Sequence, residues 1–161
     1  HDSVSWFPAP NYVVMKLYRE HYQPDRVALQ TVGALNAVAT VSADRKTLVL
    51  KVVNPMDREV KAALDLGVAS GARGGTAYVV QAGLSDRNSL AEPDHIKPVA
   101  SPLGAVPQKT DRLFPPYSVT VLELDIPDED GWKMVRYIQN PRKGRGCGEK
   151  PPPKQKTLTR Y

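Results

Sequence analysis

The acidic residues are the first candidates for chemistry, because acid–base cleavage of a glycosidic bond needs two carboxyl groups that face each other. One of the two must also lie where its surroundings raise its pKa while the other stays ionised. The glutamates considered are Glu20, Glu59, Glu92, Glu123, Glu129 and Glu149. No two of them have the spacing or the apolar setting of such a pair, so we expect all six to be solvated surface groups.

The histidines, serines and glycines give no stronger signal. His1, His21 and His95 are scattered without metal-ligand spacing, and His95 is predicted to be a surface residue of a loop. The segment 71–75 (GARGG) lacks the lysine and the following helix of a phosphate loop, which favours a flexible turn. No serine has the context of a nucleophile elbow. The serines considered are Ser85, Ser89 and Ser118. We therefore predict no catalytic, substrate-binding or metal-binding residue in this chain, and no cofactor.

Two aromatic residues, Trp6 and Phe7, come ahead of the first predicted helix. We predict that they pack between this segment and its neighbour. The alternative is that they form part of a surface on which a sugar ring stacks.

The net charge of +5 points at first to a polyanionic partner. However, seven basic residues and only one acidic residue follow Asn140, so the rest of the chain is nearly neutral. This basic segment has no aromatic residue except Tyr161, and no nucleic-acid recognition fold precedes it. We expect a solvated extension and no nucleic-acid partner.

Length and composition fit one globular domain with an additional element. The chain has 161 residues, 41% of them hydrophobic and 24% charged. No apolar run approaches the roughly 20 residues of a membrane helix, so we expect no membrane span. No basic-then-apolar leader opens the sequence, so we expect no signal peptide in this stretch. The single cysteine, Cys147, fits a reducing or an oxidising compartment, and a secreted or periplasmic parent protein is compatible with it.

The first predicted element is an amphipathic helix that begins at Pro10 or Asn11 and ends before Pro24. Asn11 is expected to cap its first turn. An apolar stripe, widened by Val13 and Met15, is expected to need a partner surface. The stripe consists of Val14, Leu17, Tyr18 and His21.

Beyond Gly33 the hydrophobic pattern changes from helical to strand-like. Strands are predicted over residues 35–43, 47–54, 59–66, 76–84 and 117–126. A flexible connection over 67–75 and a long, proline-held loop before residue 117 separate them. Residues 132–138 are expected to be either one more strand or an extension that packs across the edge of the domain. Short alternating strands with regular turns predict a mainly β fold: an antiparallel, jelly-roll-like β-sandwich preceded by one amphipathic α-helix.

Three stretches of the sequence resemble the C-terminal part of the α-L-arabinofuranosidases of glycoside hydrolase family 51. Residues 8–18 (PAPNYVVMKLY) resemble the last barrel helix of that family, and residues 47–55 (TLVLKVVNP) resemble one of its strands. The most specific stretch combines residues 84–98 (LSDRNSLAEPDHIKP) with residues 114–122 (FPPYSVTVL). The resemblance extends over about residues 6–126.

The resemblance implies that residues 1–33 are a loop and the terminal helix of a truncated (β/α)₈ barrel, and that 34–140 are the C-terminal β-sandwich. Residues 141–161 have no counterpart in the family, and their composition predicts a flexible basic tail rich in Pro and Gly. In that family, two glutamates near the ends of the fourth and seventh barrel strands catalyse a retaining reaction, and this chain would begin after both. The resemblance therefore implies a non-catalytic portion of an arabinofuranosidase that is inactive alone. The helix stripe would bury against the missing barrel.

The implied partners are the catalytic barrel of the parent enzyme and, through it, polysaccharides that contain arabinose. Contacts between copies of the parent are left open. A stand-alone carbohydrate-binding sandwich is the alternative. It would carry a row of exposed aromatic residues on one sheet face, but only Tyr78 and Tyr117 lie in the predicted strands.

Overall fold

Most of the chain is built from short strands. The computed structural model describes residues 6–29, 31–67, 71–127 and 137–139. The single helix of this described part is α1 (Pro10–Glu20). The strands are β1 (Asp25–Val27), β2 (Thr31–Val32), β3 (Asn36–Val41), β4 (Thr47–Asn54), β5 (Val60–Asp65), β6 (Gly74–Gln81), β7 (Val99–Leu103), β8 (Lys109–Phe114), β9 (Ser118–Asp125) and β10 (Tyr137–Gln139).

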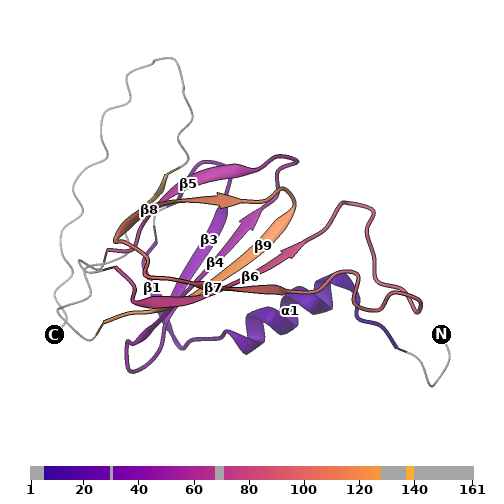
Figure 1. Cartoon of the computed structure of the whole chain (residues 1–161), viewed down its shortest axis with the longest axis horizontal. Helices are drawn as coiled ribbons and strands as arrows, with labels where there is room; N and C mark the ends of the chain where they lie inside the picture. The colour runs from indigo at the N-terminus through magenta and orange to yellow at the C-terminus, as the bar shows by residue number, and fades with distance from the viewer. Residues whose placement is uncertain (1–5, 30, 68–70, 128–136, 140–161) are drawn as a thin grey trace, which may run out of the picture.

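The strands form two sheets that face each other (Figure 1). The larger sheet has the order β1-β3-β4-β9-β6-β7, and all its pairs are antiparallel. The smaller sheet has the order β2-β10-β5-β8, with one parallel pair between β2 and β10. The predicted fold class, a mainly β sandwich preceded by one helix, is confirmed.

The inner core lies between the two sheets. Alternate residues of the central strand β4, Leu48 and Leu50, point into it and meet side chains of the smaller sheet such as Leu64 and Phe114. Phe114 is the largest fully buried side chain of the described residues. Burial of this apolar surface is the main force that holds the sheets together.

A second core lies on the opposite face of the larger sheet. There Val13 and Leu17 of α1 pack against Val49 of β4 and Val121 of β9, and the figure shows the helix lying along this face (Figure 1). Strands β4 and β9 are therefore covered on both faces, which explains why nearly all of their residues are buried or half-buried.

This second core corrects the expectation that the helix stripe buries against a missing barrel. Leu17 is 1% exposed because it packs on the chain's own sheet. Met15, which was expected to widen the stripe, is 67% exposed. Asn11 is not the cap either: Ala9 is the N-cap residue and makes no side-chain cap bond, while Pro10 supplies the first helical position.

Two stretches that were expected to be irregular contain strands. The long loop before residue 117 holds β7 and β8, and the connection over 67–75 contains the start of β6. The flexible-turn prediction is wrong at Gly71, whose φ of +71° is fixed by close packing. A Cβ atom there would lie 2.2 Å from the carbonyl oxygen of Val106. The neighbouring Ala72 pairs with Val106 in an isolated antiparallel β-bridge, in which each backbone N–H group donates to the carbonyl oxygen of the other residue.

Of the predicted C-terminal strand and tail, the structure describes only residues 137–139. Residues 137–139 form β10, at the end of the segment 132–138, for which a strand was one of two expectations. Residues 132–136 lie outside the described residues. The predicted flexible tail, 141–161, lies outside them as well.

Candidate functional site

A groove of about 540 Å³ lies beside α1. One wall is a face of the helix that carries Tyr12, Lys16 and Glu20, at intervals of four residues. The opposite wall comes from Pro93, Asp94, Lys97, Pro98 and Ala100. Apolar residues Val13, Leu17 and Ile96 also line the groove and belong to the second core.

The wall opposite the helix is held by a buried asparagine. Asn88 is 2% exposed, and its Oδ1 accepts a hydrogen bond from the Ile96 backbone N–H at 2.6 Å. Its Nδ2 donates to the carbonyl oxygens of Ile96 at 3.2 Å and Pro8 at 2.9 Å. A single side chain thus closes the loop over 88–96 and ties it to the segment that precedes α1. Because these partners are buried, the bonds fix the distance between the two walls.

Two aromatic rings form one end of the groove. Trp6 and Tyr12 meet edge to face, with ring centroids 5.5 Å apart and planes at 89°. Trp6 is 67% exposed, so its ring is open to solvent. Trp6 contacts Tyr12, but neither Trp6 nor Phe7 is buried within the described residues, as the predicted packing would require.

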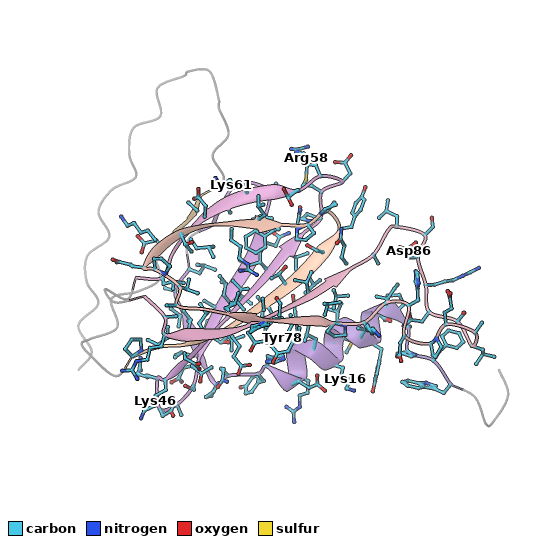
Figure 2. All side chains as sticks on the ribbon, in the orientation of Figure 1. Lys16, Lys46, Arg58, Lys61, Tyr78 and Asp86 are labelled. Atoms are coloured by element: carbon cyan, nitrogen blue, oxygen red, sulfur yellow. The ribbon has the colours of Figure 1, made fainter. Side chains whose placement is uncertain are left out.

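The other end of the groove is polar. His21 Nδ1 lies 2.5 Å from Glu123 Oε2, and the imidazole ring packs on Tyr78 with centroids 4.2 Å apart. Figure 2 shows Tyr78 above α1 and Lys16 on the helix. The sequence pattern placed His21 on the apolar stripe and Glu123 near the end of a strand; the structure brings them together across 102 positions.

The remaining sequence candidates do not converge on the groove. Glu59 is exposed in the turn before β5, and Glu92 lies 3.9 Å from His95 on an exposed loop. Of the glutamates that the structure describes, Glu20 alone lines the groove. Ser118 is buried and donates from its Oγ to the carbonyl oxygen of Pro115, which marks it as a structural residue.

Two of the serines considered above lie in exposed or partly exposed turns, and three other candidates lie outside the described residues. Ser89 Oγ accepts a hydrogen bond from the backbone N–H of Glu92, and Ser85 is exposed in a turn. His1, Glu129 and Glu149 lie outside the described residues.

Sequence reasoning missed Lys51, which lies on β4 beneath the helix. Its side chain is only 8% exposed; Nζ donates to the carbonyl oxygen of Tyr18 at 3.0 Å and lies 4.9 Å from the centre of the Tyr18 ring. Burial lowers the pKa of the Lys51 ammonium and raises the pKa of the Tyr18 hydroxyl. The available signal was a lone lysine inside a strand that is apolar on both faces.

Two features are absent from the described residues. No three His, Cys, Asp or Glu side chains among them are grouped so that they could hold a metal ion. Within the same residues, no helix is both long and apolar enough to cross a membrane.

No family model matches the sequence, and no curated protein matches it. Solved structures do match its fold. An arabinose-bound α-L-arabinofuranosidase of glycoside hydrolase family 51 aligns with a TM-score of 0.69 and 19% identity over 78% of this chain. The family 51 arabinofuranosidase of Xanthomonas axonopodis pv. citri aligns with a TM-score of 0.60 and 16% identity over 77% of it. The family 51 arabinofuranosidase of Thermotoga petrophila RKU-1 aligns with a TM-score of 0.53 and 24% identity over 58% of this chain.

These matches involve only part of each solved structure. The aligned region covers 20% of the arabinose-bound enzyme, 28% of the Xanthomonas enzyme and 20% of the Thermotoga enzyme. At this level of identity the likeness establishes a shared fold.

Proposed function

We propose that this chain is the non-catalytic C-terminal β-sandwich portion of an α-L-arabinofuranosidase. Residues 1–33 would supply a loop and the last helix of its catalytic (β/α)₈ barrel, and 34–140 the sandwich. The parent would hydrolyse terminal, non-reducing α-L-arabinofuranosyl residues with retention of configuration. The sandwich would brace the barrel, and arabinose-containing polysaccharide would be reached through the parent.

Two lines of evidence support this proposal. The three sequence stretches that resemble family 51 fall on α1, on β4, and on the loop and strand that end in β9. The same fold occurs as a minor part of solved family 51 arabinofuranosidases.

The observation that carries the bracing role is the second, outward face of α1. Leu17 is buried on the sheet, whereas Met15 and Tyr22 are 67% and 62% exposed. Large apolar side chains gathered on one exposed face are typical of a surface that meets another domain. The expected neighbour on this face is the catalytic barrel.

Hydrolysis of an aryl α-L-arabinofuranoside tests the proposal. The purified chain should show no turnover, and the full protein from the uninterrupted reading frame should show turnover. Two glutamates at the ends of barrel strands encoded upstream would supply the chemistry, and replacing either with Gln should abolish it. Turnover by the purified chain, free of contaminating enzyme, would contradict the proposal.

The described sheet faces do not favour a carbohydrate-binding module of the usual kind. Such a module would present a row of exposed aromatics on a sheet. Tyr78 is instead half-buried against His21, and Tyr117 lies in the turn before β9 with a φ of +46°.

A further inference from the structure

The groove beside α1 has a size suited to a bound molecule. Its volume, about 540 Å³, falls within the roughly 300–1,000 Å³ that is common for ligand sites. The groove runs from the Trp6 and Tyr12 rings at one end to His21 and Tyr78 at the other. Since α1 has 11 residues and rises about 1.5 Å per residue, the groove matches an elongated ligand better than a compact one.

The aromatic end of the groove offers two ring surfaces at right angles. Trp6 and Tyr12 form an edge-to-face pair, so each ring keeps a face that a ligand can cover. A saturated sugar ring has flat patches of C–H groups that pack on such a face, while its hydroxyl groups remain at the rim. Trp6 and Tyr12 are both exposed and are therefore available for this contact.

The charged residues of the groove balance one another. Lys16 and Lys97 supply two positive charges, and Glu20 and Asp94 supply two negative charges. A polyanion would be repelled by the carboxylates, and a polycation by the lysines. Carboxylates accept hydrogen bonds and ammonium groups donate them, so the four side chains together suit a neutral ligand with many hydroxyl groups.

The walls are held in place before a ligand binds. Asn88 ties the loop wall to the segment ahead of α1 through three hydrogen bonds. The helix wall is fixed by the burial of Val13 and Leu17 on the sheet. A groove with fixed walls loses little conformational entropy when it is filled.

We propose that this groove binds a short, neutral oligosaccharide, with Trp6 and Tyr12 stacking on its sugar rings. The inference rests on the residues that line the groove and does not depend on the proposed parent activity. It places the sugar contact between a helix and a loop, and it gives Trp6 the stacking role that the sequence had left open as the alternative to packing.

Calorimetric titration of the whole 161-residue chain tests the inference. The probes are arabinohexaose and xylohexaose as neutral ligands, and an oligogalacturonate of the same length as an anionic control. Saturable binding of at least one neutral probe is expected, with no binding of the anionic one. Trp6→Ala and Tyr12→Ala should each weaken binding about tenfold, the effect of removing a well-packed aromatic contact. Tyr22→Ala is the matched control, because Tyr22 is equally exposed but does not line the groove.

A second measurement reports on Trp6 itself. The chain has two tryptophans, so a Trp132→Phe variant leaves Trp6 as the only one. Addition of the neutral oligosaccharide should shift its fluorescence with the affinity measured by calorimetry. The inference is overturned if no neutral probe binds, if Trp6→Ala binds as tightly as the unaltered chain, or if the oligogalacturonate binds better. A result here leaves the hydrolase assay unaffected, so the two proposals fail separately.

Discussion

The side-chain nitrogen of Lys51 lies 3.0 Å from the carbonyl oxygen of Tyr18, so that a lysine of the central strand caps the last turn of α1. The neighbouring carbonyl groups of Leu17 and Arg19 accept hydrogen bonds from the backbone N–H groups of His21 and Tyr22. The N–H group of Tyr22, four residues after Tyr18, bonds to Arg19 instead, and Lys51 donates to the Tyr18 carbonyl oxygen in the last turn. A positive charge at a helix C-terminus also interacts favourably with the helix dipole.

This arrangement predicts a pH-dependent stability that Lys51 controls. Burial lowers the pKa of Lys51 in the folded chain below its ordinary value of 10.5, so the unfolded chain binds more protons in the window just below 10.5. The stability of the unaltered chain relative to Lys51→Met should therefore rise with pH across that alkaline window. Urea denaturation of both proteins at pH 7 and at steps up to pH 10 measures the difference. A difference that stays constant or falls with pH would contradict the role of burial.

The packing of α1 on the chain's own sheet makes Leu17 and Met15 a matched pair. Leu17→Ala should lower the free energy of unfolding by about 2–5 kcal/mol, because it empties a fully buried position between α1 and strands β4 and β9. Met15→Ala, on the exposed face, should change it by less than about 0.5 kcal/mol. Urea denaturation of the purified chain compares the two. Equal, small effects would mean that α1 needs an external surface to be held in place.

Asn88 should stabilise the groove and the segment ahead of α1 together. Asn88→Ala removes three hydrogen bonds and leaves the buried N–H group of Ile96 without a partner, which costs about 1–3 kcal/mol. Hydrogen exchange at the Ile96 amide should become faster. The control is Asn11→Ala, since the exposed Asn11 only accepts a bond from the adjacent Tyr12 N–H. Its effect should be far smaller, and a larger effect would restore Asn11 as the helix cap.

Two glycines test the packing of the connection that leads into β6. Gly71→Ala should lower the free energy of unfolding by about 1–3 kcal/mol or more, since it forces a side chain into positive φ and against the Val106 carbonyl group. Gly104→Ala meets nothing within 4 Å, so it should be neutral or stabilise the chain by up to about 1 kcal/mol. Thermal unfolding of both variants gives the comparison. Tolerance of alanine at position 71 would show that this connection is flexible after all.

Strong hydrophobic patterns made part of the fold predictable. The strand over 47–54 was predicted with its observed bounds, and α1 and β9 were predicted to within a few residues, because the apolar residues of each recur at the spacing of a helix or a strand. Strands β7 and β8 were missed for physical reasons. β7 is an edge strand with an exposed surface and an internal proline, and β8 carries Lys109, Asp111 and Arg112. Their pairing with β6 and β5 outweighs these unfavourable residues.

The groove was beyond the reach of sequence patterns because its walls are distant in the chain. Tyr12 and Lys97 face a common hollow only after the loop over 88–96 has folded back on the segment before α1. One side chain, Asn88, joins the loop to this segment. Its hydrogen-bond partners are backbone groups, which every residue type has, so the sequence gives no sign of the contact. Asn88 falls within residues 84–98, a stretch that carries the family resemblance, but its residue type alone did not predict that it joins the two walls.

The central strand β4 serves two cores at once: Leu48 and Leu50 belong to one, and Val49 to the other. Because neighbouring side chains point to opposite sides, an insertion or deletion of one residue within β4 would exchange the contents of both layers in a single step. Changes in chain length are thus restricted to places such as the open turn around Gly104, where nothing crowds the backbone. The middle strands therefore keep a fixed length, and related sequences can gain or lose residues only in the connections between strands.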